Sequence, residues 1–171
     1  MAMVPTQGKA HFLAVPTEDF TAIVDALYRF GAGQDLRDRQ LFESAFAADA
    51  VLDFTAVAAK LGVTIPVFEG RQAIVDTILT TTGILDTTHS ITNPRVKHYD
   101  GSRATLFALI EAQHLPRGDH SRHLLLKNVL DVDLASAGDH WVIERMHFEN
   151  AWRVGDADVL FKPSVTSAGP V

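Results

Sequence analysis

Cysteine is absent from the 171-residue sequence, and this absence excludes several kinds of chemistry. The chain has no disulfide bond, no thiolate nucleophile and no cysteine-ligated metal centre. A chain of this kind suits a reducing compartment. We therefore expect a cytoplasmic protein.

Long apolar runs and basic clusters are also missing. No segment approaches the ~18 apolar residues needed to cross a bilayer, and the N-terminus has no apolar run of signal-peptide length. Lys and Arg number 15 against 21 Asp and Glu, for a net charge of −6. Without a basic cluster the chain offers few counterions to a phosphate backbone. We expect neither a membrane nor a nucleic acid among its partners.

The chain is long enough to bury a sizeable core. A single domain of this length buries roughly 70% of the surface that its unfolded chain exposes. The ten Phe residues against two Tyr provide aromatic surface with few polar groups, which suits a core or a pocket for an apolar ligand. We expect a flexible N-terminal arm over residues 1–16, one domain over 17–162 and a disordered tail over 163–171.

The first half of the chain has the apolar spacing of helices. Thr17 is expected to cap a helix that begins at Glu18 and presents one apolar stripe. Gly33 is expected to break that helix. The remaining elements predicted here are helices over about 38–46 and 71–82, a short strand over 51–56, and an ambiguous stretch over 56–68 with room for a helical insert.

From Thr88 onward the pattern is that of strands. Four strands are predicted, over residues 88–99, 102–115, 122–134 and 140–152. The first is expected to bulge near Asn93–Pro94, and Asp100–Gly101 is a hairpin signal. Three helices followed by an antiparallel meander predict an α+β fold, in which an antiparallel sheet packs against the N-terminal helices.

Alternation along the strand over 102–115 places small apolar side chains and one histidine on a common face. These residues are Ala104, Leu106, Ala108, Ile110, Ala112 and His114. A row of alanines leaves space above the sheet that larger aliphatic residues would fill. On the next strand the amide of Asn128 shares a face with Leu126 and other aliphatic residues. It must find a partner, because burying it unpaired costs ~1–3 kcal/mol.

An acid and a second histidine complete a candidate site. His89 opens the first long strand, and Asp35 lies between the first two helices. A carboxylate that accepts N–H from an imidazole fixes its tautomer and raises its basicity. Together with His114 and Asn128, these groups could transfer protons over an apolar floor. Each also has a purely structural interpretation: Asp35 as a helix cap, the histidines as strand-end residues and Asn128 as a structural amide.

Four other polar residues are better explained by structure than by chemistry. Tyr28 is expected in the core with a solvated hydroxyl. His120 and His123 are expected in a solvated loop, and His147 is expected to be structural.

The order and spacing of five motifs resemble scytalone dehydratase and its SnoaL-like relatives, which belong to the nuclear-transport-factor-2-like superfamily of cone-shaped, cystatin-like folds. The motifs are Asp35–Asp38, Phe46–Phe54, Thr87–His89, His114 and Asn128. The resemblance runs from about Asp19 to Trp152, and the interval from His89 to His114 aligns without a gap.

The resemblance implies roles for individual residues. Asp35, His89 and His114 would be catalytic, and Asn128 would bind substrate. Two tyrosines that position a water in the dehydratase fall on Gln34 and Phe54 here. Besides Asn128, the substrate-binding candidates are Gln34, Phe54, Leu126, Ile110 and also Tyr28, which lies one or two helical turns earlier and could replace the missing tyrosines.

The resemblance also implies a reaction. We expect a cofactor-independent lyase of dehydratase type that acts on a mostly apolar cyclic or aromatic hydroxylated small molecule. The alternatives are an isomerase, cyclase or retro-aldol lyase in the same pocket, and a non-catalytic binding or assembly module such as a dioxygenase small subunit. Two histidines and one carboxylate could also form a facial metal triad, but the resembled family works without metal, so no metal is expected. A homodimer or homotrimer is expected.

Overall fold

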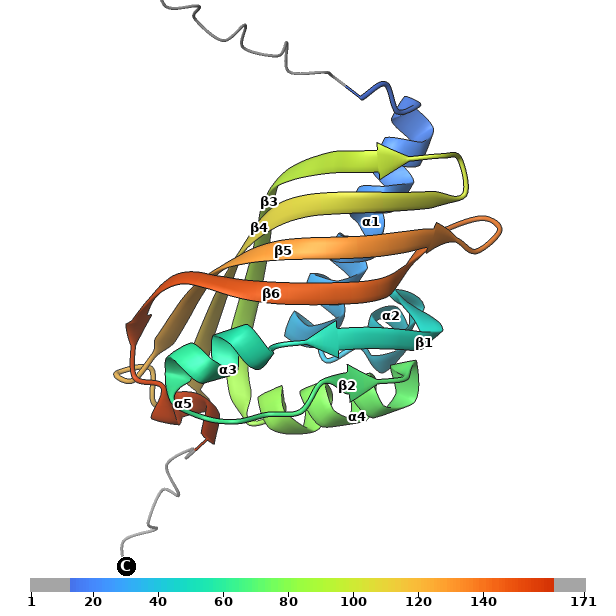
Figure 1. Cartoon of the computed structure of the whole chain (residues 1–171). Helices are drawn as coiled ribbons and strands as arrows, with labels where there is room; N and C mark the ends of the chain where they lie inside the picture. Colours follow the sequence, from blue (N-terminus) through green and yellow to red (C-terminus); the bar gives the residue numbers. More distant parts are fainter. Residues whose placement is uncertain (1–12, 162–171) are drawn as a thin grey trace, which may run out of the picture.

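The computed structural model describes residues 13–161, which fold as five helices and a six-stranded sheet (Figure 1). The expected arm and tail therefore lie almost entirely outside the described residues. The helices are α1 (Thr17–Asp35), α2 (Arg39–Ser44), α3 (Thr55–Leu61), α4 (Arg71–Thr82) and α5 (Asp158–Phe161). The strands are β1 (Phe46–Asp53), β2 (Phe68–Glu69), β3 (Leu85–Tyr99), β4 (Arg103–Pro116), β5 (Leu124–Ser136) and β6 (Trp141–Gly155).

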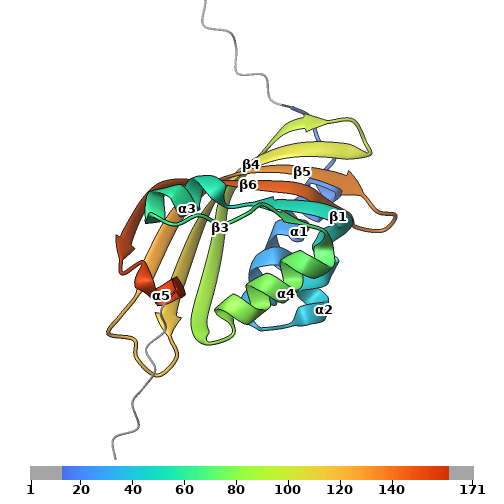
Figure 2. The same ribbon diagram turned by 60° about the horizontal axis from the view of Figure 1, so that its bottom comes forward.

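The sheet has the strand order β2-β1-β6-β5-β4-β3. All neighbouring strands are antiparallel except β1 and β6, which are parallel. The sheet curves, with α1, α2 and α4 on one side and α3 and α5 at its rim (Figure 2). The predicted α+β plan is confirmed, with α3 in the ambiguous stretch and α5 as an additional helix. Among the described residues, no helix is both long and apolar enough to cross a membrane.

Strand β4 alternates between faces as its sequence predicts. Its even-numbered residues from Ala104 to Pro116 are buried and its odd-numbered residues are more accessible. The expected bulge in β3 is also present: the pairing register shifts between Thr92 and Arg95, and Asn93 has a φ of 54°. The buried face of β4 thus forms the centre of the sheet wall that faces the helices.

The start of α1 differs from the prediction. Thr17 lies inside the helix and Pro16 occupies the cap position without a side-chain cap. Proline suits a helix start because its φ is already close to the helical value and the helix requires no N–H there. The Thr17 carbonyl instead accepts a hydrogen bond from the hydroxyl of Thr21 at 2.8 Å.

Gly33 does not break α1, contrary to the prediction. It is buried inside the helix, where an added Cβ would lie 2.6 Å from backbone atoms of Phe42. Its role is therefore to let α1 and α2 approach closely. The chain turns four residues later, where Arg37 adopts a left-handed φ of 56°. Asp38 then caps α2 by accepting a hydrogen bond from the Leu41 N–H at 3.0 Å.

Phenylalanines form the junction between helices and sheet. The ring centroid of Phe30 in α1 lies 5.7, 6.0 and 6.1 Å from the ring centroids of Phe42, Phe46 and Phe148, respectively. Phe30, Phe42 and Phe46 are fully buried. These contacts anchor the C-terminal half of α1 against β1 and β6, and so determine where the end of α1 meets the sheet.

Candidate functional site

The carboxylate of Asp35 is held by three donors from β3. Its Oδ1 accepts hydrogen bonds from Nδ1 of His89 at 2.6 Å and from the Thr87 hydroxyl at 2.9 Å, and its Oδ2 accepts the backbone N–H of His89 at 2.7 Å. Gly31, one helical turn earlier, permits this approach, because a Cβ there would lie only 3.3 Å from that of His89. Asp35 therefore joins the end of α1 to β3, and it is Asp38 that caps α2.

This bonding keeps Asp35 ionised. Burial by itself raises the pKa of the carboxyl, but hydrogen bonds and the charge interaction with His89, and the bond from Thr87, outweigh it, so the pKa lies below its usual value of 3.8. An ionised carboxylate can only accept. His89 must then carry its proton on Nδ1, which leaves Nε2 as the ring nitrogen with a free lone pair.

His114 is on β4, where it pairs with Thr87 of β3, two residues before His89. The two imidazole rings are perpendicular, with centroids 5.8 Å apart. Burial, with a smaller contribution from the charge of His89, lowers the pKa of His114 to about 4 from 6.5. Its Nδ1 is buried and has no hydrogen-bond partner among residues 13–161. At neutral pH this imidazole is therefore uncharged.

Both histidines line an apolar cavity of about 450 Å³. Its wall is formed by residues from α1, α3, α4, α5 and the sheet: Phe30, Gln34, Phe54, Val57, Ala58, Leu61, Ile65, Phe68, Thr77, Ile78, Thr81, Thr82, His89, Ala112, His114, Leu126, Asn128, Phe148, Leu160 and Phe161. A larger hollow of about 1130 Å³ beside the start of α1 has neither a histidine nor a carboxylate in its lining. The smaller cavity is thus the candidate site.

Most of the predicted site residues converge on this cavity. Gln34, Phe54, Leu126 and Asn128 line it together with the two histidines. The amide nitrogen of Gln34 donates to the Phe30 carbonyl at 3.1 Å. The ring of Phe54 lies against that of Phe148, with centroids 4.2 Å apart. The positions that correspond to the two water-holding tyrosines are therefore in the wall, but with an amide and a phenyl ring.

Three predicted residues are not in the cavity lining: Tyr28, Ile110 and Asp35, which is connected to the cavity through its hydrogen bond with His89. Tyr28 is 51% exposed and is not in the lining; its expected place in the core is also wrong, since it faces outward from α1. Ile110 is 1% exposed and packs in the core instead of the cavity wall. The alternation of β4 places Ile110 on the correct face, but the cavity occupies only the end of that face near Ala112 and His114.

Sequence reasoning missed the wall provided by helices. Thr77, Thr81 and Thr82 of α4 line the cavity, as do Leu160 and Phe161 of α5. The run of threonines in α4 was the available signal, because β-branched residues lose side-chain freedom in a helix and are not favoured there. The hydroxyls of Thr81 and Thr82 donate to the carbonyls of Thr77 and Ile78, each at 2.8 Å.

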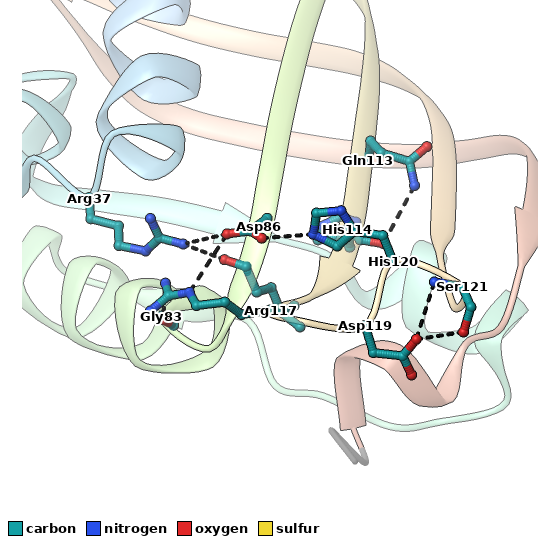
Figure 3. Close-up of polar contacts among 10 residues, drawn as sticks. Arg37, Gly83, Asp86, Gln113, His114, Arg117, Asp119, His120 and Ser121 are labelled. Atoms are coloured by element: carbon teal, nitrogen blue, oxygen red, sulfur yellow. Dashed lines mark hydrogen bonds and ion pairs between the residues drawn. The ribbon is translucent and has the colours of Figure 1, made fainter. Parts of the chain in front are cut away.

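A polar cluster on the surface borders the site next to His114 (Figure 3). The Asp86 carboxylate forms hydrogen bonds with Arg37 Nη2 at 3.4 Å and His120 Nε2 at 2.9 Å, and an ion pair with Arg117 Nε at 3.6 Å. The hydrogen bond and charge of His120, the charge of Arg117 and the hydrogen bond from Arg37 lower the pKa of Asp86. The cluster links the end of α1, β3 and the loop between β4 and β5, and it accounts for His120 without a ligand.

Two further interpretations of histidine side chains, a structural role for His147 and a metal site, can be compared with the contacts in the structure. His147 faces Asp53 at 3.0 Å and Glu149 at 3.3 Å, and it lies outside the cavity, as expected for a structural residue. Within the described part of the chain, no three His, Cys, Asp or Glu side chains are arranged to hold a metal ion. A facial triad of Asp35, His89 and His114 has no geometric support, because Asp35 is occupied by His89 and Thr87.

Comparisons with known proteins agree with this architecture. Residues 16–147 match the SnoaL-like domain family. Terrestric acid biosynthesis cluster protein E of Penicillium crustosum is 33% identical over 150 residues, which cover 84% of this chain and 90% of that protein.

Solved structures share the fold at low identity. A protein from Novosphingobium aromaticivorans DSM 12444, described as a candidate scytalone dehydratase, superposes with a TM-score of 0.69 at 13% identity over 80% of this chain and 87% of its own. Hexachlorocyclohexane dehydrochlorinase LinA-type3 from Novosphingobium barchaimii LL02 superposes with a TM-score of 0.65 at 17% identity, over 85% of this chain and 94% of its own.

Proposed function

The chain belongs to the SnoaL-like family, and from that premise we propose that it is a cofactor-independent lyase that removes water from a mostly apolar cyclic or aromatic hydroxylated small molecule. The observation that carries this proposal is the Asp35–His89 pair at 2.6 Å beside an apolar cavity that also contains His114 and Asn128. The relative from a fungal biosynthesis cluster supports a small-molecule substrate.

His89 acts as the base in this proposal. Asp35 accepts a hydrogen bond from the Nδ1–H group, so that Nε2 can take a proton from a carbon next to a carbonyl group. The resulting imidazolium is stabilised by the neighbouring carboxylate. Catalysis of this kind contributes ~10²–10⁴-fold to the rate. The electrons of the C–H bond move into an enolate, whose oxygen accepts a hydrogen bond from Asn128.

The second step expels the hydroxyl. The enolate re-forms the carbonyl as the carbon–oxygen bond breaks, the proton on His89 Nε2 passes to the departing hydroxyl, and water leaves. His114 donates or accepts a hydrogen bond as a neutral imidazole. With a pKa of about 4, it holds a proton poorly at neutral pH, so we assign the return of the proton to His89.

A carbon-to-carbon proton shift is the second candidate reaction. No tyrosine occurs among the described residues that line the cavity. Gln34 and Phe54 stand where the resemblance to scytalone dehydratase places its two water-positioning tyrosines. An isomerisation, cyclisation or retro-aldol step needs no acid that protonates a leaving hydroxyl, so this lining favours such steps. Product mass separates them from dehydration.

A non-catalytic module is disfavoured by the same geometry. Asp35 bonds to His89, the histidine rings are neighbours, and the cavity is open space instead of packed side chains. A purely structural role needs none of these features.

The test of the proposed function is turnover of a panel of hydroxylated aromatic ketones and hydroxytetralones in D₂O. Mass spectrometry reports loss of water, and NMR reports exchange of the proton next to the carbonyl. We expect at least one compound to lose water or exchange that proton with the wild-type protein but not with the His89→Ala variant. Equal activity of both proteins would contradict the proposal.

A further inference from the structure

Two buried asparagines lie side by side on neighbouring strands, and only one of them reaches the cavity. Asn128 of β5 and Asn150 of β6 are each 4% exposed and are paired in the ladder. Nδ2 of Asn150 donates to Oδ1 of Asn128 at 2.8 Å. Asn128 lines the cavity and Asn150 stands behind it. The orientation of Asn150 therefore bears on what Asn128 presents to a ligand.

The backbone determines which way the Asn150 amide faces. Its Nδ2 also donates to the carbonyl oxygens of Trp152 at 3.1 Å and Lys127 at 3.3 Å. These carbonyls lie at a bulge, where Lys127 pairs with Trp152 and Asn128 with Asn150, so that Ala151 is the extra residue. Carbonyl oxygens only accept. A rotated Asn150 would place its own oxygen against both of them, so this rotation is excluded.

The orientation of Asn150 determines that of Asn128 in turn. Because Asn150 presents a donor, Asn128 must present its oxygen to it, and its N–H groups face the other way. Among residues 13–161 the Asn128 Nδ2 makes no hydrogen bond. Because Asn128 lines the cavity, a ligand that supplies an acceptor at this point can form a hydrogen bond that a ligand without one cannot, and it gains affinity.

We propose that Asn150 is a positioning residue: it fixes the Asn128 amide with its N–H groups facing the cavity, and the site thereby selects ligands that present a carbonyl or enolate oxygen. Its consequence for turnover rests on the proposed function, since the same N–H groups would stabilise the enolate formed by His89. The selection of ligands does not depend on turnover.

The test uses two ligands of the same shape, 2-acetylnaphthalene and 2-isopropenylnaphthalene, which differ in a C=O against a C=CH₂ group. Dissociation constants are measured by NMR titration with the full chain. Wild-type protein is expected to bind the acetyl compound about tenfold more tightly, as one hydrogen bond provides. Equal affinity for the two ligands, or binding of neither, would overturn the proposal.

Asn150→Ala removes the fixed donor and leaves the Lys127 and Trp152 carbonyls to compete for the Asn128 N–H groups. We expect the preference for the acetyl compound to fall to about twofold or less, while the affinity for the isopropenyl compound changes by no more than about twofold. A merely structural role would weaken both ligands alike. A retained tenfold preference would refute the role of Asn150.

A second variant keeps the proposal falsifiable should Asn150→Ala fold poorly. Asn128→Asp preserves the acceptor for Asn150 but replaces the N–H groups with a second oxygen. The acetyl compound is then expected to bind more weakly than its hydrocarbon partner. An unchanged preference for the acetyl compound would show that the preference does not come from the Asn128 N–H groups, and it would refute the proposal. These binding results stand apart from the His89→Ala assay, so failure of either proposal is recognised separately.

Discussion

The imidazoles of His89 and His114 stand perpendicular to one another with centroids 5.8 Å apart, yet only His89 has a carboxylate partner. Asp35 fixes the tautomer of His89, whereas burial lowers the pKa of His114 to about 4. Two chemically identical side chains on adjacent strands thus have different surroundings: one bonds to a carboxylate, and the other is buried without one. This difference makes the division of labour between them testable.

The chain offers an internal control for the proposed base. Substitution of His89 or Asp35, as His89→Ala and Asp35→Asn, is expected to reduce turnover by ~10²–10⁴-fold. His147 forms a comparable pair with Asp53 at 3.0 Å but lies outside the cavity, so His147→Ala is expected to retain activity. Steady-state rates of the three variants measure the loss of activity, and their melting temperatures show whether each variant is folded. Equal losses at His89 and His147 would count against the assignment.

The buried His114 predicts a pH dependence of stability. The unfolded chain binds a proton at this residue near pH 6.5 and the folded chain only near pH 4. Between these values the unfolded state holds more protons, so the free energy of unfolding decreases as the pH falls. The loss is of the order of ~3 kcal/mol at most.

His114→Phe is expected to flatten this slope between pH 6.5 and pH 4. Urea denaturation at several pH values measures it. Asp35, whose pKa lies below 3.8, acts in a lower window: its contribution is present above pH 3.8 and is lost as the pH falls further. A slope that persists between pH 6.5 and pH 4 in the His114→Phe variant would show that another group is responsible.

Two alanines on the same face of β4 are expected to respond differently to enlargement. Ala112 lines the cavity and Ala108 packs in the core. Ala112→Leu is expected to lower the affinity for 2-acetylnaphthalene by at least about tenfold with a stability change below ~1 kcal/mol. Ala108→Leu is expected to cost ~1–3 kcal/mol through overpacking. Titration and chemical denaturation of both variants check this contrast, and the opposite pattern would place the cavity elsewhere.

Gly33 permits the contact between α1 and α2. An added Cβ would meet the Phe42 backbone at 2.6 Å, so Gly33→Ala should destabilise the protein by ~1–3 kcal/mol, even though alanine favours a helix by up to ~1 kcal/mol over glycine. Thermal denaturation measures the change. A more stable variant would show that the two helices can separate without loss.

Much of the architecture could be predicted from local patterns. The bounds of α4, the alternation of β4 and the bulge at Asn93–Pro94 follow from residue types that act over a few positions. The family and its fold were also recognisable from the spacing of Asp35, His89 and His114. By contrast, the cap at Thr17 and the break at Gly33 were wrong, because Pro16 and the contact with Phe42 outweigh local preferences.

The cavity was harder to predict than the fold. Tyr28 and Ile110 were expected to bind substrate, but the end of the cavity and the outward direction of Tyr28 depend on how α1, α4 and α5 pack against the sheet. Asn150 was missed for the same reason, since its importance lies in a contact with Asn128 across two strands. The cytoplasmic location, the expected oligomer and the domain limits remain predictions.

The sequence alone determined which groups are available: an acid at the end of the first helix, two histidines and an amide on strands, and no cysteine. Only the tertiary structure decided which histidine receives the carboxylate, which is buried without one, and which end of the Asn128 amide faces the cavity. The reason is physical. Charge and hydrogen-bonding capacity belong to a residue, whereas basicity and direction arise from neighbours that folding brings together.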